Sequence, residues 1–283
     1  MDCPPPGGKN TVSNESLRQY LNILALEGIC KEWLYGIEKC ILTPYLQKAQ
    51  WMVDLDSTLA YLLSLKEKYS ASYYRKHLLQ IRKFLQYLDI EWSKKIIAPD
   101  ETTYTPKRIS NEDIQQTVNF FKDNPCYLQT KALILLGITS GMRAEETYQL
   151  RIEDIDLSSR TVRINNDPKN HQSTKTGHSR VSFFTEEAKE ALEAYLGFYK
   201  GQKTFDYLFG ASHITRLFSN APVKVKDFRK YFSQNWDRLG GPTGVKKLLM
   251  GHSFRNDTDL KHYNGQNEED LKRIYDKVMG QGV

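Results

Sequence analysis

The chain has 283 residues, of which 40% are hydrophobic and 12% aromatic. These values exclude a wholly disordered protein, and the length suits two domains better than one. Lys and Arg outnumber Asp and Glu by 40 to 34, an excess that permits binding to phosphate groups but does not establish it.

The first part of the chain is predicted to be helical. Residues 1–15 have almost no apolar content and are expected to form a flexible tail. After them, apolar side chains recur at three- and four-residue spacing, and two long helices are predicted over 56–69 and 71–88. No strand pattern precedes residue 100. We therefore expect an all-α domain over residues 16–98.

A linker is predicted over residues 99–107, which contain two prolines, small polar residues and no periodicity. Ser110 and Asp113 then form a capping-box pattern that opens a new helix. The domain at 108–283 is predicted to be mixed α+β, mainly helical with a small antiparallel sheet. Its strands are expected at 161–164 and 180–184, with a polar hairpin between them. Its further helices are expected at 127–138, 143–149, 185–199, 226–239, 244–250 and 268–279.

The turn after the first long apolar helix of this domain carries an arginine. The sequence there is ALILLGITSGMRAEETYQLRIEDID. It resembles the first signature box of the tyrosine recombinases, the family of phage integrases and Xer recombinases. The resemblance implies that Arg143 is a catalytic arginine and that Glu146 supports it. Taken alone, a surface salt bridge at a helix start would explain the same residues.

Two further boxes follow in the order of that family. VKVKDFRKYF resembles its second arginine box and implies a catalytic role for Arg229, and LLMGHS, with the histidine 23 residues further on, implies one for His252. Arginine suits this work because its planar guanidinium grips the non-bridging oxygens of a phosphodiester and never deprotonates. The resemblance implies a C-shaped clamp of an all-α core-binding domain and a catalytic domain around duplex DNA.

The nucleophile implied by the resemblance is a tyrosine soon after His252, and only Tyr263 lies at a suitable distance. The separation is 11 residues, about two more than is common in the family. Because the pKa of free tyrosine is ~10, nearby cations would be needed to favour its anion. The alternative is that Tyr263 is a packing residue. Tyr275 is a poorer candidate because it lies within a predicted helix.

Two lysines complete the set of candidates. Lys226 stands where the family usually has a histidine; some archaeal viral integrases have a similar substitution, and its expected role is phosphate binding or stabilisation of the tyrosinate. Lys175, in TKTGHSR, resembles the hairpin lysine that protonates the leaving 5′ oxygen. An exposed hairpin lysine without a catalytic role would look the same, and Lys169 is the alternative donor.

A basic segment in the first domain is a candidate DNA-binding surface. Residues 66–84 hold six cations and one anion, with tyrosines between them. Such residues mainly contact backbone phosphate, although a solvated helix face would look similar. The candidates are Lys66, Lys68, Tyr73, Arg75, Lys76, Arg82 and Lys83.

No cofactor is expected. The four cysteines have no metal-ligand spacing, and a covalent phosphotyrosine conserves the energy of the phosphodiester, so neither a metal nor ATP is required. No apolar run approaches the ~20 residues that span a bilayer, and residues 1–16 are too polar for a signal peptide. We therefore expect a cytoplasmic, nucleoid-associated protein.

The function implied is site-specific recombination or integration of double-stranded DNA through a 3′-phosphotyrosine intermediate, by an archaeal-type integrase or Xer-like recombinase. A homo-tetramer on two DNA sites is expected, with the helix at 268–279 docked either on a neighbouring subunit or on its own domain. The alternatives are a type IB topoisomerase and a non-catalytic DNA-binding protein on a recombinase scaffold. The target DNA sequence is not encoded in these motifs.

Overall fold

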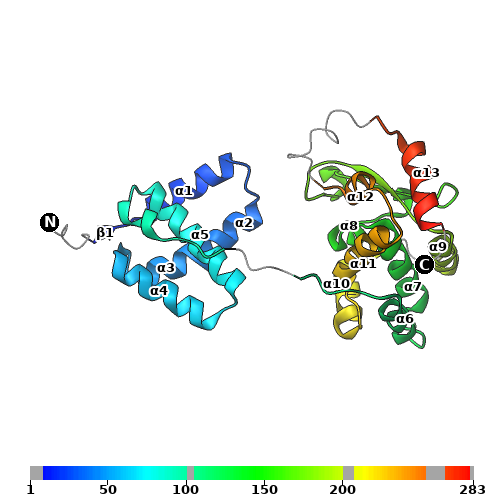
Figure 1. Cartoon of the computed structure of the whole chain (residues 1–283), viewed down its shortest axis with the longest axis horizontal. Coiled ribbons are helices and arrows are strands. Elements are labelled where there is room, and N and C mark those ends of the chain that lie inside the picture. Colours follow the sequence, from blue (N-terminus) through cyan, green and yellow to red (C-terminus); the bar gives the residue numbers. More distant parts are fainter. Residues whose placement is uncertain (1–8, 101–104, 200–206, 253–264, 281–283) are drawn as a thin grey trace. The chain divides into compact units, whose positions relative to one another are not determined.

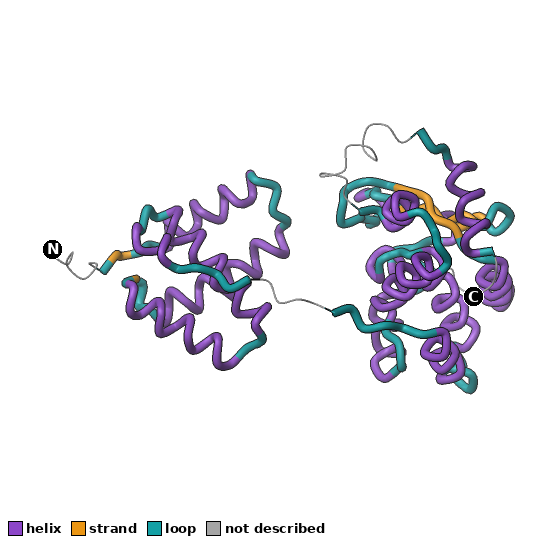
Figure 2. Tube along the Cα trace, in the orientation of Figure 1, coloured by secondary structure: helices purple, strands orange, loops and turns teal. Residues whose placement is uncertain are grey.

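The structure, a computed structural model, describes residues 9–100, 105–199, 207–252 and 265–280. It divides into two compact units, Met1–Thr105 (unit 1) and Pro106–Val283 (unit 2), which are described separately (Figures 1 and 2). Within the described ranges, no helix is both long and apolar enough to cross a membrane.

Unit 1 is built mainly from helices around one apolar core (Figure 2). Its elements are β1 (Asn10–Thr11), α1 (Asn14–Leu26), α2 (Lys31–Gly36), a π-helix (Ile37–Leu42), α3 (Thr43–Lys48), β2 (Met52–Val53), α4 (Leu55–Lys68), α5 (Ala71–Tyr87) and a 3₁₀ helix (Glu91–Lys95). The two long helices begin where polar side chains cap them, because Asp54 accepts from the Ser57 N–H and Ser70 from the Tyr73 N–H. Both predicted long helices are confirmed to within one residue at each end.

Two predictions for unit 1 need correction. The unit is not purely helical, since β1 and β2 form a short antiparallel pair that joins Asn10 to Val53. The predicted tail over 1–15 ends sooner than expected, because Val12 is buried and α1 already begins at Asn14. Residues 1–8 lie outside the described ranges. The pair escapes pattern analysis because two-residue strands have no periodicity to detect.

Unit 2 contains a small sheet within a set of helices (Figures 1 and 2). Its helices are α6 (Asn111–Phe120), α7 (Tyr127–Ser140), α8 (Ala144–Tyr148), α9 (Glu186–Tyr199), α10 (Ala211–Leu217), α11 (Val225–Arg238), α12 (Thr243–Met250) and α13 (Glu268–Met279). The predicted capping box is confirmed at the start of α6, where Ser110 and Asp113 satisfy each other's backbone N–H groups.

The sheet of unit 2 has three antiparallel strands in the order β3-β4-β5. They are β3 (Ile155–Asp156), β4 (Thr161–Ile164) and β5 (Arg180–Phe183). The two predicted strands are confirmed, and Ile164 pairs with Arg180 at the end that leads into the hairpin. The third strand, β3, is too short to show an alternating pattern and was not predicted.

Helix α7 forms the centre of unit 2. Nearly all of its residues from Gln129 to Ser140 are buried, as expected for a helix that is apolar on every side. Helix α11 approaches it closely at two glycines: a Cβ on Gly137 would lie 2.8 Å from the Phe228 ring, and one on Gly141 would lie 2.5 Å from the Phe232 ring. This packing fixes the position of α11 along α7, and with it the positions of the other side chains of α11.

Helix α13 packs on its own unit, beside the sheet (Figure 1). Tyr275 and Met279 are fully buried against Phe183 of β5 and Trp236 of α11. The Tyr275 hydroxyl donates to the Thr139 carbonyl at 2.9 Å, and burial raises its pKa. Of the two placements left open by the sequence, the structure contains the one on the helix's own domain.

The close approach of α11 to α7 gives a stability test. Gly141 ends α7 with φ +66°, so Gly141→Ala adds both backbone strain and a clash with Phe232. We expect a loss of about 2–4 kcal/mol in the free energy of unfolding, measured by urea denaturation. Gly177→Ala is the matched control, since Gly177 has φ +72° and nothing within 4 Å; it should lose only about 1–2 kcal/mol. Equal losses would contradict the packing argument.

Candidate active site

The candidate site begins at the turn between α7 and α8. Arg143 is the residue before α8, and its backbone N–H donates to Glu146 Oε2 at 2.8 Å. Its side chain turns back to the same carboxylate, with Nη1 donating to Glu146 Oε1 at 2.8 Å. The motif thus forms one half of a capping box, in which the N3 carboxylate accepts from the backbone N–H before the helix, and the same carboxylate also holds the arginine side chain.

Glu146 has a second arginine partner, Arg180 at the start of β5. Arg180 Nη1 and Nη2 donate to the two carboxylate oxygens at 3.0 and 2.6 Å. The Glu146 side chain is only 2% exposed. Burial by itself would raise its pKa, but the hydrogen bonds and charges of Arg180 and Arg143 outweigh burial and lower it. The carboxylate therefore stabilises the fold at neutral pH, and this contribution is lost as the pH falls through its folded-state pKa.

The two predicted catalytic arginines converge on one short piece of backbone. Arg143 Nη2 donates to the Gly251 carbonyl at 3.0 Å. Arg229 Nη1, from α11, donates to the Met250 carbonyl at 2.7 Å and to the Gly141 carbonyl at 2.8 Å. The end of α12 therefore receives both arginines at consecutive residues, directly before His252.

Positive charge is in excess in this cluster. Burial lowers the pKa of Arg229 to about 10, and the nearby charges of Arg143 and Arg180 add to the effect, while Glu146 partly offsets it. The pKa of His252 is lowered as well, first by partial burial and then by Arg229 and Arg143. Burial and the neighbouring arginines therefore both disfavour the charged form of the His252 ring. An anion placed among these groups would supply the missing negative charge.

The two candidate lysines and the alternative, Lys169, are exposed at the surface. In sequence they lie before Arg229 or before Arg180. Lys226 is exposed in the first turn of α11, three residues before Arg229. Lys175 is exposed in the turn before β5, five residues before Arg180, and Lys169 is exposed in a 3₁₀ helix earlier in the hairpin. None of the three makes a contact with the arginine cluster within the described ranges.

The predicted nucleophile, Tyr263, lies outside the described residues. The structure does describe its competitor, Tyr275, whose hydroxyl is buried and donates to a backbone carbonyl. A phenol with no exposed surface and a raised pKa cannot reach or attack a DNA phosphate. The geometry therefore argues against Tyr275.

The DNA-binding candidates of unit 1 fall into two groups. Arg75 Nε donates to the Pro99 carbonyl at 2.9 Å, and Arg82 Nη1 donates to the Ile96 carbonyl at 3.2 Å, so both arginines brace the segment after α5. Lys76 lies over the Trp33 ring at 3.9 Å, and Tyr73 stacks on His77 with ring centroids 4.0 Å apart. Lysines 66, 68 and 83 are exposed.

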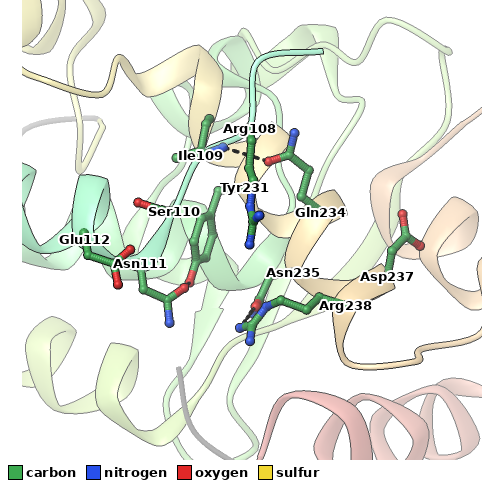
Figure 3. A pocket seen from close by; sticks show the side chains of 10 residues that line it. All are labelled: Arg108, Ile109, Ser110, Asn111, Glu112, Tyr231, Gln234, Asn235, Asp237 and Arg238. Carbon is green, nitrogen blue, oxygen red and sulfur yellow. Dashed lines mark hydrogen bonds between the residues drawn. The ribbon is translucent and has the colours of Figure 1, made fainter. Parts of the chain in front are cut away.

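A pocket of unit 2 lies on a different side of α11 and contains none of the candidate residues (Figure 3). Gln234 bridges the chain where it enters the unit, accepting from the Ile109 N–H and donating to the Lys107 carbonyl. Tyr231 donates to Asn111 at 2.9 Å. This pocket is therefore a seam between α11 and the first residues of the unit.

Arg180 is the site residue that sequence analysis missed. The available signal was the strand pattern, because Arg180 and Ser182 lie on one face of β5 and Ser182 is fully buried. Two polar residues on an inward face indicate polar partners there. Ser182 donates to the Ser140 carbonyl at 2.6 Å, and Arg180 reaches Glu146.

Comparison with solved structures identifies the fold. An integrase of the Tn1549 transposon, solved in complex with circular intermediate DNA, has a TM-score of 0.63 at 17% identity and covers 93% of this chain and 98% of its own. A lambda integrase, solved as a tetramer bound to a Holliday junction, has a TM-score of 0.62 at 13% identity and covers 86% of this chain and 78% of its own. At these identities the likeness concerns the fold alone.

Comparison of sequences identifies the family. Tyrosine recombinase XerA of Saccharolobus solfataricus is 29% identical over 213 residues, which is 72% of this chain and 67% of that protein. The Phage integrase family matches residues 107–267, a range that takes in Arg143, Arg180, Arg229 and His252. Because this range is more than half of the chain, the protein belongs to the Phage integrase family, the tyrosine recombinases.

Proposed function

We propose that this protein is a site-specific DNA recombinase that cleaves and rejoins DNA strands through a 3′-phosphotyrosine at Tyr263. The observation that carries the proposal is the convergence of Arg143 and Arg229 on the consecutive carbonyls of Gly251 and Met250. Three segments far apart in the sequence thereby meet at one place, with His252 next to them. Such an arrangement is what a single phosphate needs in order to be gripped from two sides.

The arginines keep donors for a substrate. A guanidinium has five N–H groups, and the contacts described above occupy two on each of Arg143 and Arg229. The remaining donors would bind the non-bridging oxygens of the scissile phosphate and stabilise the charge that grows on them in the transition state. Because the arginines are already held by backbone and carboxylate, little reorganisation accompanies the reaction.

The chemical step follows from these roles. The Tyr263 phenolate attacks phosphorus, the bond to the 5′ oxygen breaks, and Lys175 gives that oxygen a proton. Lys226 stabilises the phenolate or the phosphate, and the neutral ring of His252 hydrogen-bonds to the phosphate. A second 5′ hydroxyl then reverses the step and reseals the strand. No cofactor takes part, since the phosphotyrosine keeps the energy of the original bond.

The partner is double-stranded DNA, and the assembly is a tetramer on two sites. The lambda integrase solved as a tetramer bound to a Holliday junction supports this assembly. Unit 1 would serve as the core-binding domain. Its exposed lysines at 66, 68 and 83 suit phosphate contacts, whereas Arg75 and Arg82 have part of their donors committed to backbone carbonyls. Association with nucleoid DNA follows from this role.

The nucleophile is tested by covalent capture. Wild-type protein incubated with a pool of nicked duplexes of randomised sequence should form an adduct that survives denaturation by SDS, because the nick lets the 5′ end diffuse away. The duplex that the wild-type protein links covalently, called the captured duplex, is then sequenced and used alone. Tyr263→Phe should bind it normally and form no adduct, whereas Tyr275→Phe should still form the adduct. Peptide mapping identifies the linked residue, and a phosphotyrosine at any other position would overturn the assignment.

The arginines are tested by separating cleavage from binding. Arg143→Ala and Arg229→Ala should each slow single-turnover cleavage of the captured duplex by about 10²–10³-fold or more, since each removes transition-state charge stabilisation. The dissociation constant for DNA should change only a few fold, because binding is spread over many phosphates. Arg163→Ala, an exposed arginine of β4, is the control. Cleavage at the wild-type rate by either site variant would contradict the proposal.

Metal removal gives a third test. Within the described ranges, no group of three or more His, Cys, Asp or Glu side chains could hold a metal ion, and charge stabilisation is assigned to arginine. We therefore expect adduct formation at an unchanged rate in excess EDTA. Strict dependence on added magnesium would instead indicate a metal-dependent nuclease.

A further inference from the structure

Arg180 has no place in the catalytic step proposed above, yet it is the most constrained arginine of the cluster. Its side chain is 10% exposed. It makes two hydrogen bonds to Glu146 of α8, and its Nε donates to the Leu249 carbonyl of α12 at 2.9 Å. One side chain of β5 thus ties together the helix that follows Arg143 and the helix that precedes His252.

The first consequence concerns Glu146. A carboxylate offers about four lone-pair positions, and all four are occupied here. Oε1 accepts from Arg143 Nη1 and Arg180 Nη1, and Oε2 accepts from the Arg143 backbone N–H and Arg180 Nη2. Because Arg180 binds both oxygens, it fixes the plane of the carboxylate. The direction of the Arg143 guanidinium is fixed with it.

The second consequence concerns Gly251, whose carbonyl holds the other nitrogen of Arg143. Gly251 has φ +63°, and a Cβ there would lie 2.8 Å from Cδ, Nε and Nη1 of Arg180. Arg180 therefore lies directly against this residue and also holds the Leu249 carbonyl two positions earlier. Arg180 therefore contacts both residues that orient Arg143: it hydrogen-bonds to the Glu146 carboxylate and packs against Gly251, whose carbonyl accepts from Arg143.

We infer that Arg180 is a positioning residue for DNA cleavage, which aims the Arg143 guanidinium at the scissile phosphate by fixing its two acceptors. This inference rests on the proposed function. Arg180 does not bind the phosphate itself, because its charge is paired with Glu146 and its side chain is largely buried. Its place at the start of β5, directly after the hairpin that carries Lys175, also links that hairpin to the arginine cluster.

The test is a double-mutant cycle on the captured duplex. Arg180→Lys keeps the positive charge but cannot bind both carboxylate oxygens in a planar fork. We expect single-turnover cleavage to slow by about 100-fold, the cost of a misplaced catalytic group, with DNA affinity unchanged within a few fold. In an Arg143→Lys background, the same substitution should slow cleavage by no more than a few fold, because there is no longer a guanidinium to aim. Arg163→Lys, on the neighbouring strand β4, should have no effect.

The outcomes separate this inference from the proposed function. If Arg180 only supported the fold, Arg180→Lys would slow cleavage by the same factor in both backgrounds, and the inference would be overturned. Cleavage by Arg180→Lys at the wild-type rate would also overturn the inference about Arg180. The proposed function would still stand in that case, provided that the wild-type protein forms the adduct. If the wild-type protein formed no adduct with any duplex, both would fail.

A second pair of variants disturbs Arg180 without replacing it. Gly251→Ala places a methyl group against the Arg180 side chain, whereas Gly240→Ala, with φ +73° and nothing within 4 Å, imposes the same backbone strain in open space. We expect Gly251→Ala to slow cleavage at least 10-fold more than Gly240→Ala, at equal thermal stability of the two variants or after correction for the folded fraction. Equal rates in the two variants would overturn the inference.

Discussion

One buried carboxylate, Glu146, holds the arginine cluster of this protein in place. It is nearly inaccessible to solvent and accepts hydrogen bonds from Arg143, the residue before its own helix, and from Arg180 on the sheet. Burying an unpaired carboxylate would be prohibitive, and removing one partner of such a buried pair costs about 3–5 kcal/mol because the other charge is left without compensation. The position of the α7–α8 turn relative to β5 is therefore set by charge pairing as well as by apolar packing.

The same pairing leaves the cluster short of negative charge. Three arginines share one carboxylate, and their other hydrogen-bond acceptors among the described residues are the backbone carbonyls of Gly141, Leu249, Met250 and Gly251. Carbonyl dipoles orient a guanidinium without neutralising it. The pKa of Arg229 falls because its side chain is buried and because the charges of Arg143 and Arg180 lie nearby. In the proposed function, a phosphodiester supplies the missing charge at the place where the donors already point. Under that proposal, substrate binding and transition-state stabilisation use one preformed arrangement.

The scaffold explains how residues so far apart in sequence are held to such accuracy. Close contact of α11 with α7 at Gly137 and Gly141 sets the position of Arg229 relative to α7. Gly251, with its left-handed backbone, ends α12 so that successive carbonyls accept from the two arginines. Helix α13 packs Tyr275 and Met279 against β5 and α11. Packing within the unit thus holds the arginines in place, whereas Lys175 lies in an exposed turn and Lys226 is exposed near the start of α11.

The sequence by itself predicted the long helices and the β4–β5 hairpin, because periodicity and capping boxes are local patterns. The resemblance of its motifs to those of the tyrosine recombinases pointed to Arg143, Glu146, Arg229 and His252 as candidate site residues. The sequence did not reveal the β1–β2 pair, which joins Asn10 to Val53, or β3, because strands of two residues have no pattern. Nor did it reveal Arg180, whose partner lies 34 residues away, or the docking of α13 on its own unit. These features were decided by tertiary structure, since which distant groups meet depends on burial and charge compensation in the packed chain, and neither is written in local spacing.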